Sequence, residues 1–326
     1  MNDLEKKTVR TKRNFTYTYY TSPAVQGKAT ILLQHGFPDS ALVWEFVITR
    51  CLVPANYGII APDMLGYADT DKPEDPAQYK MSGIAADLVD ILDAEGVQKV
   101  ISLGHDWGSR TAQALYNHYP HRVEGLALFN LTYIPVTTQP FNLDAANEAS
   151  LQRFGHGMFC YWKLFTADDG PQLLQENADV LFDILHTPEV WQDLLCVEGA
   201  LRTAIETRGA DLDLTRRAYA TEEMKQAFVE RFRRDGFEAP VCYYKSMVLG
   251  HQDGDGNIEN NIVRVPVFYV GYNEDFLCKH DLMSDVMRDG FTPRLTMTRL
   301  TGGHWGFLEN PSRLGAMLME WLGYRS

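Results

Sequence analysis

The sequence predicts an α/β protein with a mostly parallel, doubly wound sheet that is interrupted once by a long helical insertion. Apolar, β-rich runs alternate with segments of helical periodicity up to residue 133 and again from residue 262. This strand–helix–strand rhythm is typical of parallel sheets. Residues 134–261 instead contain helical segments and no buried-strand signal. We therefore expect residues 1–133 and 262–326 to form one core, and residues 134–261 to form a helical lid, or cap.

The first half of the core is expected to contain five strands and two helices. Phe15–Tyr20 alternates threonine with aromatic residues, as strands often do. Four further runs are short, apolar and typical of buried strands: Ala29–Gln34, Tyr57–Ala61, Val100–Leu103 and Val123–Phe129. Met81–Glu95 has helical spacing of its apolar residues and Gly96 as a stop, and a second helix is expected over Trp107–Tyr119.

The second half is expected to begin with the helical insertion and to end with two strands and a helix. The helices expected in the insertion are Ala145–Phe154, Pro171–His186, Pro188–Thr207 and Thr221–Asp235. The later elements are the strands Val265–Val270 and Leu295–Leu300 and the helix Pro311–Leu322. Long insertions at the loop tips of α/β domains often cover the functional site.

Composition and charge exclude several classes of protein. The chain has 326 residues, of which 45% are hydrophobic, and carries 30 Lys+Arg against 43 Asp+Glu for a net charge of −13. A nucleic-acid partner is not expected, because phosphate binding needs a basic face. The five cysteines are scattered and odd in number, which favours a reducing compartment and a cytoplasmic location. Neither a secretory signal nor a membrane span is expected.

The strongest functional signal is Gly104-His105-Asp106-Trp107-Gly108, between the strand Val100–Leu103 and the next helix. This is the sequence context of a nucleophile elbow, a sharp turn whose small flanking residues avoid clashes. The exposed central residue is here an aspartate, Asp106, and no G-x-S-x-G occurs in the chain. A serine esterase is therefore disfavoured.

A carboxylate nucleophile restricts the reaction class. Its attack on an acyl group would give only an anhydride, whereas its attack on an electrophilic sp³ carbon gives an ester that water then opens. The substrate should therefore carry a strained or good leaving group, as an epoxide or a halide does. Opening the ester requires a general base for water and an acid that orients the base.

Both groups are present in the chain order expected after the nucleophile. His304, in Gly302-Gly303-His304-Trp305-Gly306, follows the last expected strand, and glycines on both sides leave it room. Asp275 follows the strand Val265–Val270 and is the preferred acid, with its neighbour Glu274 as the alternative.

His35-Gly36-Phe37-Pro38 follows the strand Ala29–Gln34. In this architecture the loop at that place and the residue after the nucleophile each donate a backbone N–H to the oxyanion hole. The N–H groups of Phe37 and Trp107 are the expected donors.

Together these motifs resemble those of the epoxide hydrolases of the α/β-hydrolase fold, from about Phe15 to Leu322. The matching segments are His35–Pro38, Pro62–Tyr67, Gly104–Gly108, Glu274–Phe276 and Gly302–Gly306. The resemblance implies an α/β-hydrolase fold with a cap, a covalent alkyl-enzyme intermediate and no cofactor. The amino-terminal phosphatase-like domain of some members is not expected. The partners implied are a small epoxide and water, and association into a homo-oligomer stays open.

The resemblance also implies two lid tyrosines that protonate the epoxide oxygen. Tyr161 and Tyr244 stand at the matching positions, with Tyr243 and Tyr133 as rivals. An apolar substrate body is expected from aromatic residues of the lid and of the core opposite: Phe154, Phe159, Trp162, Phe37 and Trp107.

Two alternatives remain. A dehalogenase would share the fold and the Asp-His-Asp machinery. Haloalkane dehalogenases usually have asparagine where Phe37 stands, and haloacetate dehalogenases have D-R-x-x-R where this chain has Asp106-Trp107-Gly108-Ser109-Arg110. Haloacetate dehalogenases also usually carry a histidine where Tyr161 stands. A non-catalytic binding protein of the same fold would be expected to lack Asp106 or His304.

No metal site is expected. Asp253–Asn257 begins like a calcium loop, but Ile258 and Arg264 replace the required glycine and glutamate.

Overall fold

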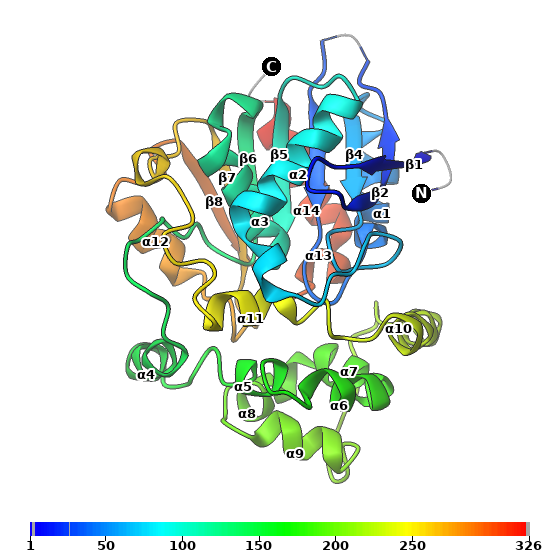
Figure 1. Ribbon diagram of the computed structural model, residues 1–326, viewed down its shortest axis with the longest axis vertical. Coiled ribbons are helices and arrows are strands. Elements are labelled where there is room, and N and C mark those ends of the chain that lie inside the picture. Colours follow the sequence, from blue (N-terminus) through cyan, green and yellow to red (C-terminus); the bar gives the residue numbers. More distant parts are fainter. Residues whose placement is uncertain (2–3, 26, 324–326) are drawn as a thin grey trace.

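The computed structural model describes residues 1, 4–25 and 27–323 of the chain. Its strands form one eight-stranded sheet of order β1-β2-β4-β3-β5-β6-β7-β8 (Figure 1). β2 runs antiparallel to both of its neighbours, and every other pair is parallel. The strands are β1 (Glu5–Arg10), β2 (Thr16–Ser22), β3 (Thr30–Gln34), β4 (Gly58–Pro62), β5 (Val100–His105), β6 (Val123–Phe129), β7 (Val267–Tyr272) and β8 (Leu295–Leu300). The predicted α/β class and mostly parallel sheet are confirmed.

Helices cover both faces of this sheet, which is why the central strands are apolar throughout. Figure 1 shows α2 (Met81–Ala94) and α3 (Trp107–His118) in front of the sheet, with α13 (Gly306–Glu309) and α14 (Pro311–Gly323) behind it. α1 (Glu45–Val47) packs near α14, and α12 (Asp281–Arg288) lies between β7 and β8 in sequence. Every residue of β4, β5 and β7 is buried, as parallel strands between two helical layers must be.

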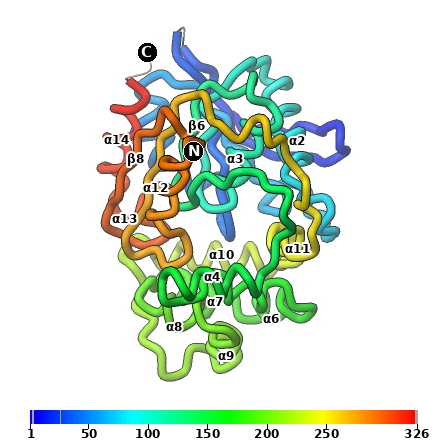
Figure 2. The backbone as a smooth tube through the Cα atoms, turned by 90° about the vertical axis from the view of Figure 1, so that its left-hand side faces the viewer, coloured from blue at the N-terminus to red at the C-terminus, as the bar shows by residue number. Residues whose placement is uncertain are grey.

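The segment between β6 and β7 is helical over its described elements. It lies beyond the carboxyl ends of the parallel strands, as Figures 1 and 2 show. Its α-helices are α4 (Leu143–Phe154), α5 (Trp162–Phe165), α6 (Gly170–Glu176), α7 (Ala178–Leu185), α8 (Trp191–Leu194), α9 (Ala200–Glu206), α10 (Glu222–Asp235) and α11 (Cys242–Val248). This end of a parallel sheet is where α/β proteins bind ligands.

Two of the helices predicted in the insertion are each divided into two helices in the structure, so the prediction of single helices is wrong there. Pro171–His186 is divided between α6 and α7 at Asn177, whose side-chain amide donates to the Leu173 carbonyl oxygen at 3.0 Å. Pro188–Thr207 is divided between α8 and α9, where Gly199 has φ +77°. In both places a residue suited to helix ends interrupts an apolar pattern that continues beyond it.

None of the helices in residues 1, 4–25 and 27–323 combines the length and the apolar character that crossing a bilayer requires. All five cysteines are free. The cytoplasmic location stays a prediction, and residues 324–326 of the predicted core lie outside the described part of the chain.

The close approach of α3 to the sheet depends on two glycines that flank the elbow. A Cβ atom on Gly104 would overlap the backbone carbonyl of Gly108. A Cβ atom on Gly108 would overlap the carbonyl of Gln34 in β3. Backbone atoms in a strand and a helix have no room to move aside, so these positions fix how α3 sits on β3 and β5.

Replacing Gly104 with alanine is therefore expected to destabilise the fold. We expect Gly104→Ala to lower the free energy of unfolding by about 3 kcal/mol, the upper end of the usual cost of overpacking. Chemical denaturation of the purified variant measures this change. Gly323→Ala is the matched control, because a Cβ there would meet nothing within 4 Å. Equal stabilities of the two variants would contradict the role assigned to Gly104.

Candidate active site

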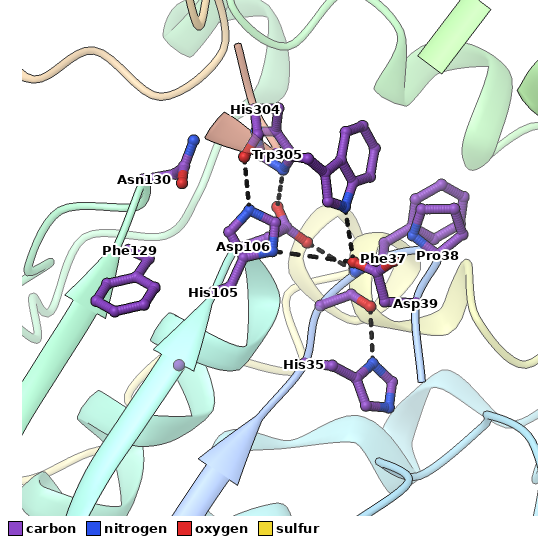
Figure 3. Close-up of polar contacts among 12 residues, drawn as sticks. His35, Phe37, Pro38, Asp39, His105, Asp106, Phe129, Asn130, His304 and Trp305 are labelled. Atoms are coloured by element: carbon purple, nitrogen blue, oxygen red, sulfur yellow. Dashed lines mark hydrogen bonds and ion pairs between the residues drawn. The ribbon is translucent and has the colours of Figure 1, made fainter. Parts of the chain in front are cut away.

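Asp106 occupies the turn between β5 and α3, at the carboxyl edge of the sheet (Figure 3). Its backbone has φ +55° and ψ −126°, a strained conformation for a residue with a side chain. The turn directs the carboxylate away from the sheet, into the space between β3 and the helical insertion. Gly36 lies directly beside it, and a Cβ there would overlap Asp106 Oδ1.

Backbone N–H groups contact this carboxylate. The Phe37 N–H donates to Asp106 Oδ1 at 2.8 Å. Burial raises the pKa of Asp106, while the charge of His304 and the N–H groups of Trp107 and Phe37 act in the opposite direction without cancelling the rise. The two N–H groups that the sequence suggested for an oxyanion hole therefore both face the Asp106 carboxylate.

His304 and Asp275 approach Asp106 from the loops after β8 and β7. His304 Nδ1 lies 2.7 Å from Asp275 Oδ2. His304 Nε2 lies 3.6 Å from Asp106 Oδ2, a contact that Figure 3 marks with a dashed line. With the Nδ1–H donated to Asp275, the lone pair of Nε2 points toward Asp106. The three side chains thus have the geometry of a nucleophile, a base and an orienting acid.

Asp275 is held as an anion although it is completely buried. Burial would raise its pKa, but the charge and hydrogen bond of His304, together with other donors, hold the pKa below its usual value. The Asn130 side-chain amide donates to Oδ2 at 2.7 Å, and the N–H groups of Leu277 and Cys278 donate to Oδ1 at 2.9 and 3.0 Å. These donors compensate the loss of water.

The pKa of His304 is raised by the acids around it. Burial opposes the charged imidazole, but the attraction and hydrogen bond of Asp275 and the charges of Asp106 and Asp39 outweigh it. The neighbouring His105 fixes the backbone of this loop, since its Nε2 lies 2.9 Å from the His304 carbonyl oxygen (Figure 3). Burial keeps the pKa of His105 well below its usual value, so its ring is neutral and donates there.

Glu274, the alternative acid, lies elsewhere. Its carboxylate accepts from Arg217 Nη2 at 2.6 Å and is partly exposed. The structure brings Asp275, and not Glu274, to His304. The two neighbours differ because Asp275 turns inward under the backbone N–H groups that follow it.

Asp106 and His304 open into a cavity of about 290 Å³ between the sheet edge and the insertion. Its walls are almost entirely apolar or aromatic. Of the residues predicted to act or bind, the cavity is lined by Phe37, Asp106, Trp107, Phe159, Tyr161, Trp162, Tyr244 and His304. Asp275 lies behind His304.

The side chains of Tyr161 and Tyr244 lie next to one another in this wall, with ring centroids 6.0 Å apart. Burial, strengthened by the nearby Asp106 charge, raises the pKa of both well above the usual value, so both hydroxyls stay protonated. The rivals are placed differently. Tyr243 donates to the Leu65 carbonyl oxygen at 3.2 Å, and neither it nor Tyr133 is among the lining residues.

Phe154 is a correction, since it is not among the residues that line the cavity. It is the last residue of α4, before Gly155 in the left-handed conformation. The Arg153 guanidinium lies 5.0 Å from its ring centroid. The helix end turns this ring toward Arg153, which the spacing of aromatics in the sequence could not show.

Several site residues were not singled out in the sequence. Asn130 has φ +66° directly after β6. A polar residue at the end of a buried strand is the sequence signal that could have identified it. Trp191 packs against His304 with ring centroids 5.4 Å apart, but nothing in its own sequence distinguishes it from a core residue. The other unpredicted lining residues include Met158, Phe165, Leu195, Met247 and Cys278.

One trio of described residues brings potential metal ligands together: Asp275, Cys278 and His304, with ligand atoms within 4.8 Å of one another. Asp275 and His304 are already joined by their hydrogen bond. Burial raises the pKa of the Cys278 thiol well above its usual value, so it is not the thiolate that a metal prefers. The trio therefore fits a proton-transfer pair better than a metal centre.

Comparisons with known proteins identify the family and the fold. The family model described as "alpha/beta hydrolase fold" matches residues 29–311. The "Bifunctional epoxide hydrolase 2" of Sus scrofa is 26% identical over 296 residues, which are 90% of this chain and 51% of the relative. The chain thus spans about half the length of that relative. "Epoxide hydrolase A" of Mycobacterium tuberculosis is 24% identical over 311 residues, 91% of each chain.

Solved structures show the same fold. An epoxide hydrolase variant from Vigna radiata superposes with a TM-score of 0.80 at 21% identity, covering 99% of this chain and 100% of the other. Epoxide Hydrolase A from Mycobacterium thermoresistibile gives a TM-score of 0.77 at 22% identity, covering 98% of each chain. With its sheet order, its elbow and a family match over most of its length, the chain belongs to the alpha/beta hydrolase fold family.

Proposed function

We propose that this protein is an epoxide hydrolase that opens an apolar epoxide to a vicinal diol through an ester on Asp106. The observation that carries the proposal is the placement of one carboxylate nucleophile, 3.6 Å from His304 Nε2, in a cavity whose wall also holds two protonated tyrosines. The names of the relatives support the same reaction. The apolar cavity wall supports an apolar substrate body.

In the first step, Asp106 attacks an epoxide carbon. Oδ1 is held by the Phe37 N–H, so Oδ2 is the free nucleophile and Oδ1 becomes the ester carbonyl oxygen. The C–O bond of the ring breaks, and its electron pair stays on the epoxide oxygen. Tyr161 and Tyr244 hydrogen-bond this oxygen, and one of them gives it a proton. Both hydroxyl groups are protonated before the ring opens, so either can supply this proton.

In the second step, water opens the ester. Neutral His304 takes a proton from water at Nε2, and the hydroxide formed attacks Cγ of Asp106. The negative charge that develops on Oδ1 is stabilised by the N–H groups of Phe37 and Trp107, each worth about 3 kcal/mol in comparable sites. Collapse breaks the ester C–O bond and expels the diol as an alkoxide, which takes the proton from His304. The carboxyl proton left on Asp106 returns to the tyrosinate formed in the first step, so the enzyme is regenerated. Asp275 stabilises the charged imidazole during this step.

The insertion is proposed to act as a lid, with residues 1–133 and 262–326 as the core. Support comes from the cavity walls, since Asp106 and His304 belong to the core ranges and Tyr161 and Tyr244 to residues 134–261. A lid that excludes water strengthens the electrostatic interactions inside the site.

The dehalogenase alternative has less support. A halide needs a side-chain donor near the nucleophile, and Phe37 supplies only its backbone N–H, which already binds Asp106. Trp107 stands where a haloacetate dehalogenase has its first arginine. A non-catalytic binding protein would have no use for a base 3.6 Å from a buried carboxylate.

Trapping the ester tests the mechanism. His304→Gln removes the base for the second step but leaves the nucleophile, so we expect the ester to accumulate when the variant is mixed with styrene oxide. Mass spectrometry should find the added mass of the epoxide on the peptide that contains Asp106. Asp106→Asn is the paired variant, which should form neither adduct nor diol. An unmodified Asp106 peptide in His304→Gln would contradict the covalent mechanism.

The tyrosines should govern the first step. Replacing either Tyr161 or Tyr244 with phenylalanine removes one donor to the epoxide oxygen, so we expect the rate of ester formation to fall roughly 10²-fold, as loss of a proton donor usually causes. Stopped-flow measurement of the first turnover isolates this step. Tyr243→Phe is the matched control, because that hydroxyl faces the Leu65 carbonyl and not the cavity. Equal losses in all three variants would indicate a structural effect.

The pH dependence of ester opening should report His304. Its pKa is raised, and only the neutral imidazole accepts a proton from water, so the rate should be lost as pH falls through that raised pKa. Asp275→Asn removes the largest charge that raises the His304 pKa. We therefore expect the loss of rate at acid pH, the acid limb of the pH profile, to move to lower pH, and ester opening itself to become slower. Single-turnover diol release measured across pH gives both effects.

A control separates His304 from a second titrating group. Burial raises the pKa of Asp39 to about 6, so this carboxyl group could also impose a loss of rate at acid pH. If Asp39→Asn abolished the acid limb and Asp275→Asn left it in place, the limb would belong to Asp39 and the prediction would be wrong.

A further inference from the structure

Arg110 is the one Lys or Arg side chain among the described residues that line the reaction cavity. It lies on α3, one helical turn after Asp106. Its backbone N–H donates to the Asp106 carbonyl oxygen at 3.3 Å, and its side chain also lines a small second cavity beside Tyr133 and Asp255. A cation in a wall that is otherwise almost entirely apolar and aromatic requires an explanation.

No carboxylate among the described residues lies within 4.0 Å of the Arg110 guanidinium. Its described hydrogen bond runs from Nη1 to the Ile134 carbonyl oxygen at 3.0 Å, which uses one of its five N–H donors. The nearby Asp255 acts on its charge from a distance, and Asp255 Oδ2 accepts instead from the Ser82 N–H at 2.9 Å.

Holding the Ile134 segment does not require a charge. Gln113, on the same helix, already binds this segment with a neutral amide. Its Nε2 donates to the Thr132 carbonyl oxygen at 2.9 Å, and its Oε1 accepts from the Ile134 N–H at 2.8 Å. A buried cation is costly unless an anion accompanies it. Arg110 is half-buried, and desolvation lowers its pKa although the nearby Tyr133 and Asp255 act in the opposite direction.

We propose that Arg110 binds a carboxylate of the substrate, so that the epoxide opened here is an epoxy acid. This inference rests on the proposed function. The planar guanidinium suits a carboxylate, to which it donates two parallel hydrogen bonds. The two residues are four positions apart, about 6 Å along the helix axis, which favours a short spacing between the epoxide ring and the carboxylate. With a net charge of −13 the protein repels anions in general, so a local cation is needed to hold one.

The test compares acids with their neutral amides. Glycidate and glycidamide, and the next longer homologue of each, are offered to the wild type, Arg110→Gln, Arg110→Lys and Arg153→Gln. We expect the wild type to prefer one of the acids in kcat/KM by about 10-fold or more. Arg110→Gln should bring that ratio to about one, mainly through KM, and Arg110→Lys should retain part of it. Arg153→Gln is the matched control, since Arg153 pairs with Asp285 at the surface.

Two results would overturn the inference. One is a wild type that opens the amides as well as the acids. The other is an Arg110→Gln variant that loses activity equally on both, with the acid-to-amide ratio unchanged, as a purely structural arginine would cause. Thermal unfolding of each variant shows whether it is folded, and Arg110→Lys replaces Arg110→Gln if the latter is not.

A second measurement separates this inference from the proposed function. If the wild type opens neither these epoxides nor styrene oxide, the proposed function has failed, and equilibrium binding of propanoate and propanamide then decides the role of Arg110. Tighter binding of propanoate to the wild type but not to Arg110→Gln supports the carboxylate site, and equal binding overturns it. Chloride release from chloroacetate that depends on Arg110 would likewise support the carboxylate site while replacing epoxide opening with dehalogenation.

Discussion

The site depends first on the strained turn at Asp106. A residue with φ +55° is held there because α3 lies directly against β3 and β5, which in turn requires glycine at positions 36, 104 and 108. The same turn places the Asp106 carboxylate at the amino terminus of α3, where the helix dipole favours negative charge. It also directs the N–H groups of Phe37 and Trp107 at the carboxylate. One backbone constraint thereby sets the nucleophile, its electrostatics and the anion-stabilising donors together.

The second constraint is electrostatic and acts through burial. Asp106, Asp275 and His304 lose water together, so each must find its stabilisation in the others or in fixed donors. Asp275 has three donors besides His304, and its pKa is lowered; Asp106 has fewer, and its pKa is raised. This difference fits the proposed roles, in which the well hydrogen-bonded Asp275 holds the imidazole and the less stabilised Asp106 is the nucleophile.

The sequence predicts the parts of this protein that depend on local pattern. Seven strands and the elbow follow from apolar runs and glycine spacing. β1 (Glu5–Arg10) was not predicted, because most of its residues are charged and it lies at the sheet edge, where its side chains bury little apolar surface. The breaks at Asn177 and Gly199 and the position of Phe154 depend on how the insertion folds on itself. Asn130 is recognisable only once β6 brings it beside Asp275. Arg110 already stands out in the sequence against the D-R-x-x-R pattern, but its place in the cavity wall is known only from the structure.

The cavity wall connects these constraints with the choice of reaction. A halide leaving group takes its charge away as a weak base and needs only donors, whereas epoxide opening leaves an alkoxide, which is a far stronger base than a phenolate. The high pKa of Tyr161 and Tyr244 therefore does not prevent proton transfer, and it keeps both protons in place until the ring opens. Since that proton is needed only as the alkoxide forms, these hydroxyls stabilise the transition state more than the bound epoxide. Arg110 lies in the same low-polarity wall, and none of the described carboxylates is within ion-pair distance of it, so the proposed reaction and the proposed substrate both depend on this feature of the cavity.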